Sequence, residues 1–211
     1  MHPHEIEAES FRIIEAEAGP HGFAADTWQV LRRMIHTSAD FDYLHSVRFH
    51  PQAISAGVAA IRGGRTVITD THMAAAGIRK PDAERFGVAV QCYMDDPAVH
   101  AAAASAGTTR AAAAVAAAVA ERPDGIYVIG NAPTALLRLI ELVRSGVARP
   151  ALIVGLPVGF VNAAESKAAL LELNHPFITN AGRKGGSNVA AAVVNALLIL
   201  AQDSSKLQAK S

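Results

Sequence analysis

Arg33 and His36 have side chains whose types and spacing could carry out acid–base chemistry on an anionic ligand. Residues three or four apart share one face of a helix, and Gln29 extends this face one turn back. An imidazole has an ordinary pKa near ~6.5, so His36 could exchange a proton at neutral pH, while Arg33 could hold the anion. The alternative is a solvated helix face, which the residue types alone favour.

Ser10 is a further candidate, because it falls inside the apolar stripe of a helix predicted over Ile6–Ala18. The apolar residues of that stripe and its edge are Ile6, Phe11, Ile13, Ile14 and Ala18. A buried hydroxyl needs a hydrogen-bond partner. The residues alone favour the helix's own carbonyl one turn back, and the alternative is a ligand.

The segment Gly182–Ser187, GRKGGS, has the composition of an anion-binding loop. Its glycines permit positive φ and a close approach of the backbone, and Arg183 and Lys184 add two cations. Because a helix is predicted to follow, free N–H groups converge on the same place. The loop does not match G-x-x-x-x-G-K-[ST], and no G-x-G-x-x-G follows a predicted strand, so ATP and dinucleotide binding are not indicated.

Arg110 lies in the first turn of a predicted helix, after Gly107-Thr108-Thr109 divides the alanine-rich segment Ala98–Ala120. A helix N-terminus carries a partial positive charge, so a cation there is unfavourable unless an anion binds beside it. Arg110 is therefore either a ligand for an anion or a surface arginine without a role.

Composition argues against several classes of partner. The 211 residues hold 19 Lys+Arg and 19 Asp+Glu, so no net charge attracts nucleic acid or a membrane. Cys92 is the single cysteine, and His2, His4, His45 and His50 lie at a chain end or beside a predicted loop without an H-E-x-x-H pattern, so no metal site is expected. Without a secretory signal or a long apolar span, a cytoplasmic protein is expected.

The elements that must position these residues follow a repeated strand–loop–helix pattern. Three consecutive units are predicted, within Gly125–Glu141, Ala151–Leu173 and Phe177–Ala201, and two earlier strands at Thr66–Thr69 and Phe86–Met94. We expect one α/β domain over residues 1–211: a three-layer αβα sandwich with a mostly parallel sheet of about five strands and an N-terminal helical segment. In such sheets ligands bind beyond the carboxyl ends of the strands.

Turn residues give two further expectations. Asp70 follows the first of these strands and is expected to cap a helix that begins near Met73. Arg79-Lys80-Pro81 is expected to end that helix.

Several runs resemble the precorrin-8X methylmutase family of cobalamin biosynthesis. They are RMIH at Arg33–His36, IGNAPTAL at Ile129–Leu136, GLPVGFV at Gly155–Val161 and AESK at Ala164–Lys167. The glycine loop and the turn before Arg110 fit as well, and the resemblance covers nearly the whole chain.

The resemblance implies an isomerase that moves a methyl group from C11 to C12 of precorrin-8X to give hydrogenobyrinate; a cobalt-containing counterpart gives cobyrinate. It implies no separate cofactor, and a homodimer whose active sites are lined by both subunits. The family's catalytic histidine corresponds to His36, and its substrate-contacting serine and arginine correspond to Ser10 and Arg33. This match reverses the preference stated above for these three residues.

We accordingly expect His36 to protonate the macrocycle and to take the proton back. Other groups would bind the carboxylates of the substrate, with Asn131 and Gly185 contributing backbone N–H groups. These residues are Arg33, Arg110, Asn131, Arg183, Lys184 and Gly185. Two alternatives remain: a corrinoid carrier without turnover, and a nucleotide- or sugar-phosphate-dependent enzyme that uses the glycine loop.

Overall fold

The computed structural model describes residues 3–208, which build a six-stranded sheet in the order β1-β6-β5-β4-β2-β3. The strands are β1 (Val47–Phe49), β2 (Val67–Thr69), β3 (Val90–Cys92), β4 (Ile126–Ile129), β5 (Leu152–Gly155) and β6 (Phe177–Asn180). All neighbours are parallel except β1, which runs antiparallel to β6. The predicted, mostly parallel sheet is confirmed, with one strand more than expected.

The additional strand lies between His45 and His50, where a loop was predicted. β1 is only three residues long, VRF, which is too short to show the alternation of a strand in the sequence. The Val47 position pairs with Asn180, so this strand completes the sheet beside β6.

Helices cover both faces of the sheet. They are α1 (Pro3–Ala18), α2 (Ala25–Ser38), α3 (Tyr43–Ser46), α4 (Ala53–Arg62), α5 (His72–Gly77), α6 (Lys80–Glu84), α7 (Pro97–Ala106), α8 (Arg110–Glu121), α9 (Pro133–Arg144), α10 (Ala163–Leu171) and α11 (Ser187–Gln208). None of the helices within residues 3–208 combines the length and apolar composition needed to cross a bilayer.

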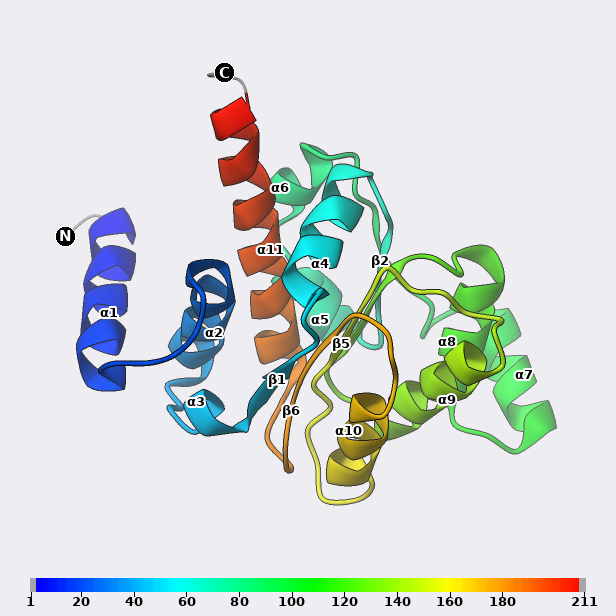
Figure 1. Ribbon diagram of the computed structural model, residues 1–211. Helices are drawn as coiled ribbons and strands as arrows, with labels where there is room; N and C mark the ends of the chain where they lie inside the picture. Colours follow the sequence, from blue (N-terminus) through cyan, green and yellow to red (C-terminus); the bar gives the residue numbers. More distant parts are fainter. Residues whose placement is uncertain (1–2, 209–211) are drawn as a thin grey trace.

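Alternation along the central strands creates the layers. In β4, Ile126 and Val128 pack with α2, α4, α6 and α11, whereas Tyr127 and Ile129 pack with α8, α9 and α10. The two helical groups lie on opposite sides of the sheet (Figure 1). This arrangement confirms the predicted three-layer sandwich, and it follows from strands that are apolar at every position because both of their faces are buried.

Two predicted boundaries are wrong. Lys80-Pro81 begins α6 instead of ending the previous helix, which already stops at Gly77; proline is favoured in the first helical turn. The strand predicted over Phe86–Met94 shortens to β3, because Phe86 and Gly87 turn back onto α6 and Gly87 adopts a φ of +66°.

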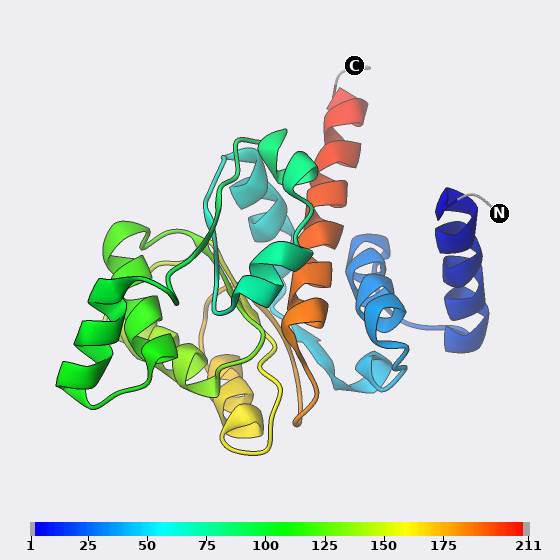
Figure 2. The same cartoon turned by 180° about the vertical axis from the view of Figure 1, so that it is seen from behind.

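Helix α1 lies at the flank of the molecule and packs on α2 (Figures 1 and 2). Ile14 of its predicted stripe is buried and Phe11 and Ala18 pack against the core, but Ile6 is 52% and Ile13 43% exposed. The stripe is narrower than predicted because α1 lies at the flank of the molecule and packs chiefly on α2. His2 lies outside the described residues.

Candidate active site

The loops that follow the parallel strands meet at one edge of the sheet, at the lower end of the molecule in Figure 1. Asp70 follows β2, Gly130 follows β4, Leu156 follows β5 and Ala181 follows β6. This is the edge at which open α/β sheets bind ligands.

Asp70 has a different role from the predicted one. Its buried carboxylate accepts hydrogen bonds from the backbone N–H groups of Gly130 (2.9 Å), Asn131 (2.8 Å) and Ala132 (2.7 Å). Burial raises the pKa of the Asp70 carboxyl, while these N–H donors act in the opposite direction. The neighbouring Thr71 caps α5 instead, by accepting from the N–H of Ala74.

This contact changes the expectation for Asn131. Its backbone N–H already donates to Asp70 and is therefore not free to bind a substrate carboxylate. The Asn131 side chain is exposed and remains available.

The glycine loop, residues Gly182–Ser187, is held close to the end of β5. The N–H of Gly186 donates to the carbonyl of Leu156 at 2.9 Å, and a Cβ at Gly185 would overlap that same carbonyl oxygen. Gly186 adopts a φ of +135°, which disfavours any other residue. The predicted close approach at Gly185 is thus made to the protein's own backbone.

The two cations of the glycine loop differ in their surroundings. Lys184 Nζ lies 2.6 Å from Asp40 and 2.5 Å from Asp42, and these pairs raise the pKa of Lys184 and lower that of Asp40. Arg183 lies 5.6 Å from the ring centroid of Phe160, which is 86% exposed. Within residues 3–208, Arg183 has no ion pair, so it is the cation of this loop that can accept an anion directly.

A second group of side chains forms on the α1–α2 face, around Phe11. The Phe11 ring stands edge-on to His36, with centroids 5.1 Å apart, and the Arg33 guanidinium lies 5.1 Å from the same ring. His36 is exposed in the last turn of α2, whereas Arg33 is half-buried. The predicted shared face of Arg33 and His36 is therefore present.

The other two candidate residues of α1 and α2, Arg33 and Ser10, are already engaged. Arg33 forms an ion pair with Glu7 at 3.0 Å, and the Ser10 hydroxyl donates to the Ile6 carbonyl at 2.8 Å. The Ser10 bond is the one that the residues alone favoured. A ligand carboxylate would compete with Glu7 for Arg33, whereas the Ser10 oxygen can still accept a hydrogen bond.

Arg110 lies apart from His36 within one chain. It is the first residue of α8, as predicted, and the Thr109 hydroxyl caps this helix. α8 and α1–α2 occupy opposite flanks in both views (Figures 1 and 2). The structure therefore brings Arg33 and His36 together, whereas α8, which begins with Arg110, lies on the opposite flank from α1–α2.

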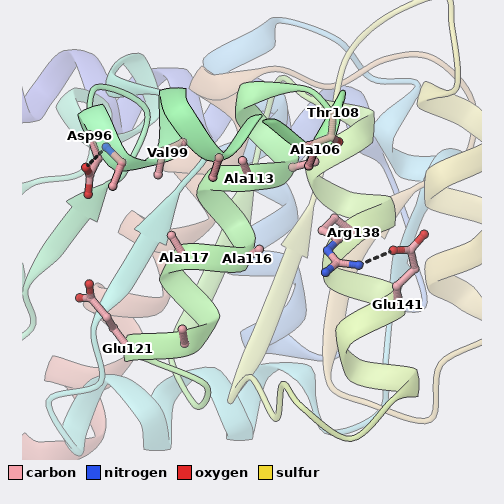
Figure 3. A pocket seen from close by; sticks show the side chains of 14 residues that line it. Asp96, Val99, Ala106, Thr108, Ala113, Ala116, Ala117, Glu121, Arg138 and Glu141 are labelled. Atoms are coloured by element: carbon pink, nitrogen blue, oxygen red, sulfur yellow. Dashed lines mark hydrogen bonds and ion pairs between the residues drawn. The ribbon is translucent and has the colours of Figure 1, made fainter. Parts of the chain in front are cut away.

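A cavity of about 730 Å³ does not have the chemistry of an anion site. It is a groove between α7, α8 and α9, lined chiefly by alanines such as Ala113, Ala116 and Ala117 (Figure 3). Its charged residues are Asp96, Glu121, Glu141 and Arg138, and Arg138 is paired with Glu141 at 3.0 Å. The excess of acid argues against a polycarboxylate here.

Lys167 was assigned no role from the sequence. It is 1% exposed on α10, and its Nζ donates to the Lys184 carbonyl (2.6 Å) and to Asn180 Oδ1 (3.2 Å). The available signal was its spacing: Lys167 falls on the same helical face as Ala163, Ser166 and Leu170, which is the buried face of α10. Among the residues with described side chains, no group of three or more His, Cys, Asp or Glu is placed to hold a metal ion.

Comparison with known proteins adds independent findings. The family model "CbiC: Precorrin-8X methylmutase" matches residues 5–200. A cobalt-precorrin-8 methylmutase of Priestia megaterium is 48% identical over 201 residues, covering 95% of this chain and 89% of that protein. A precorrin-8X methylmutase of Pseudomonas aeruginosa is 42% identical over 197 residues, covering 91% and 93%. The solved precorrin-8x methyl mutase of Thermus thermophilus has a TM-score of 0.89 at 48% identity, covering 95% and 97%.

Proposed function

The chain belongs to the precorrin-8X methylmutase family, isomerases of cobalamin biosynthesis, and from this premise we propose that it moves a methyl group from C11 to C12 of the macrocycle with His36 as the acid and base. An intramolecular shift of this kind needs neither a nucleophile nor a separate cofactor. It needs a macrocycle held in a reactive geometry and protonated at the right ring nitrogen.

The observation that carries the role of His36 is its place beside Arg33 around Phe11. The imidazole is exposed at the end of α2, so a ring nitrogen can reach a bound macrocycle, while the edge-on contact with Phe11 limits its orientation. A positioned acid–base group of this type contributes about 10²–10⁴ in rate. Ser10, on the neighbouring helix α1, would contact the substrate through its hydroxyl oxygen, which can still accept a hydrogen bond.

The carboxylates of the substrate would be bound by the cations of the carboxyl edge and of α8. Arg183 and the backbone of the glycine loop offer unpaired donors, and Arg110 and the Asn131 side chain offer others. Lys184 takes part only if a substrate carboxylate displaces Asp40 or Asp42 from it. Lys184 is thus the weakest of these assignments on energetic grounds.

The position of α8 supports a homodimer. In one chain, α8, which begins with Arg110, and the α1–α2 face that carries His36 lie on opposite flanks (Figure 2), so a shared site would pair the Arg110 of one copy with the His36 of the other. We therefore include in the proposal a homodimer with active sites shared between subunits. The proposal also takes residues 1–211 as a single domain acting in the cytoplasm.

The names of the relatives indicate that cobalt-precorrin-8 should be tested as a substrate beside metal-free precorrin-8X. The relatives from Priestia megaterium and Salmonella typhimurium, 48% and 47% identical, are both named cobalt-precorrin-8 methylmutase. The relative named for metal-free precorrin-8X in Pseudomonas aeruginosa is 42% identical. The cobalt would lie within the ring of the substrate and needs no protein ligand.

A visible-absorption assay tests the proposal with precorrin-8X and cobalt-precorrin-8 in parallel. Wild type is compared with His36→Ala, and both are titrated with hydrogenobyrinate. We expect wild type to convert at least one substrate, and the variant to bind the product without conversion. Equal conversion by both proteins would remove His36 from the chemistry, and binding without conversion of either substrate by wild type would favour a carrier.

A further inference from the structure

Lys167 is a buried cation for which the described part of the chain provides no carboxylate. Its two acceptors are neutral: the Lys184 carbonyl oxygen at 2.6 Å and the Asn180 side-chain oxygen at 3.2 Å. Burial lowers the pKa of Lys167 to about 8, so the ammonium form still prevails at neutral pH. Burying a charge without a counter-charge lowers the stability of the folded protein, and an apolar side chain of similar volume at the same position would lower it less.

The contacts of Lys167 fix the inner side of the glycine loop. Asn180, which accepts from Lys167, donates its Nδ2 to the carbonyls of Ala181 (3.1 Å) and Lys184 (3.0 Å). The Arg183 carbonyl accepts from the N–H of Gly159 at 3.2 Å. The carbonyl groups at Ala181, Arg183 and Lys184 are thus all bonded to the protein.

The N–H groups of the same loop are left free. Among the hydrogen bonds of residues 3–208, the N–H groups of Gly182, Arg183, Lys184 and Gly185 donate to no protein acceptor. Successive backbone N–H groups of this kind form a concave site for an anion. The neighbouring helix α10, which carries Lys167, lies beside this loop in both views (Figures 1 and 2).

We propose that Lys167 is a positioning residue for substrate binding: its buried ammonium group holds the glycine loop from inside, with the N–H groups outward, and adds its positive charge to a macrocycle carboxylate bound there. The inference rests on the proposed function and names the part of the site that takes one carboxylate. A carboxylate of the substrate then supplies the counter-charge that Lys167 lacks. This role would explain why a charged residue is buried at a position where folding alone does not require one.

The exposed cations of the loop do not replace this charge. Lys184 is compensated by Asp40 and Asp42, and Arg183 reaches outward over Phe160. Lys167 instead contacts the carbonyl of the Lys184–Gly185 peptide, whose N–H is one of the free donors, and the low dielectric of its buried place strengthens its effect on a bound anion.

The test compares two variants that remove this charge in different ways with one charge-matched control. Lys167→Met removes the ammonium group at similar volume. Asn180→Asp keeps Lys167 but places a carboxylate beside it; it also removes the two Nδ2 hydrogen bonds to the loop, and its own melting temperature measures that loss. The control is Lys80→Met, an exposed lysine of α6 at a distance from the loop. Each protein is titrated with hydrogenobyrinate, assayed for kcat and KM, and melted without ligand.

We expect Lys167→Met and Asn180→Asp each to raise the product Kd and the KM about tenfold, the effect of one unit charge at roughly 10 Å in a medium of intermediate dielectric constant. Their kcat should stay near that of wild type, since His36 is untouched, and Lys80→Met should bind as wild type does. Lys167→Met should melt no lower than wild type.

Equal product Kd for Lys167→Met and wild type would overturn the role of Lys167 while leaving the proposed function intact. A lower melting temperature of Lys167→Met, together with unchanged affinity of Asn180→Asp, would show a merely structural lysine and also overturn it. Wild type that binds no corrin would overturn the proposed function itself, and with it the carboxylate named here.

Discussion

The Asp70 carboxylate, at the end of β2, accepts a hydrogen bond from the Gly130 N–H, at the end of β4, over 2.9 Å. With the N–H groups of Asn131 and Ala132 also bound, one buried side chain caps the turn that opens α9. The N-cap residue Ala132 has no side-chain oxygen for this purpose. Because Asp70 occupies these N–H groups, the N-terminus of α9 is not available to bind a substrate anion. The glycine loop before α11 keeps free N–H groups for this purpose.

Asp70→Ala should strongly destabilise the protein. The substitution leaves three buried or partly buried N–H groups without an acceptor, which we expect to lower the free energy of unfolding by about 3 kcal/mol. Urea denaturation measures this change, with Glu17→Ala, an exposed carboxylate of α1, as the control. A loss no larger than that of the control would show that water satisfies these N–H groups.

Gly130→Ala should disturb the site through packing. A Cβ at this position would lie 2.7 Å from Ser187 Cα and 2.9 Å from Ser187 N, so the turn after β4 and the start of α11 would have to separate. We expect a loss of about 1–3 kcal/mol in unfolding free energy and weaker binding of product. Gly22→Ala, which has no heavy atom within 4 Å, is the matched control. Equal melting of both variants would contradict the close approach.

Substitutions at Arg33 and Glu7 should change affinity in opposite directions. Glu7 pairs with Arg33 at 3.0 Å and competes with a substrate carboxylate. We expect Arg33→Ala to weaken product binding about tenfold or more, and Glu7→Gln to tighten product binding by about two- to fivefold. Higher salt should weaken the binding of product to Arg33→Ala further, because it screens the remaining cations. Product titration by visible absorption measures both. Unchanged affinity of Arg33→Ala would remove Arg33 from the site.

The free energy of unfolding should rise in mild alkali, because the buried Lys167 loses its charge there. Burial lowers its pKa from 10.5 to about 8 in the folded chain. The unfolded chain therefore binds more protons between these values, so the free energy of unfolding rises with pH across this window, by on the order of 3 kcal/mol in total. Below about pH 8 this stabilisation is absent.

The measurement is the difference in unfolding free energy between wild type and Lys167→Met at several pH values in this window. The difference cancels the contribution of Tyr43, whose pKa burial raises to about 12, and those of other titrating groups. A pH-independent difference would mean that Lys167 keeps its ordinary pKa.

Mixed dimers should recover activity if the active sites are shared. His36→Ala and Arg110→Ala are each expected to be nearly inactive alone. Because each mixed dimer would hold one intact site, equal mixing after subunit exchange should restore about a quarter of wild-type activity. Activity assays of the mixture, with sedimentation to establish the dimer, measure this. No recovery in mixtures that demonstrably exchange subunits would place His36 and Arg110 in different sites or in one chain.

Much of this architecture could be read from the sequence because the signals are local. The strand–loop–helix repeats, the place of Arg110 in the first turn of α8 and the glycine loop each depend on residues within a few positions of one another. Apolar residues at every position of β4 and β5 already require helices on both faces. The shared face of Arg33 and His36 likewise follows from helical spacing alone.

Only the tertiary structure decided the long-range contacts. Asp70 and Ala132 are 62 residues apart, and Lys184 and Asp42 are 142 apart, and no local pattern selects one such partner over another. The same holds for the burial of Lys167 and for the exposure of Ile6 on α1. A helix shows which residues share a face, but only the packing of neighbouring elements decides whether that face meets protein or water, and hence whether a charge is compensated or left for a ligand.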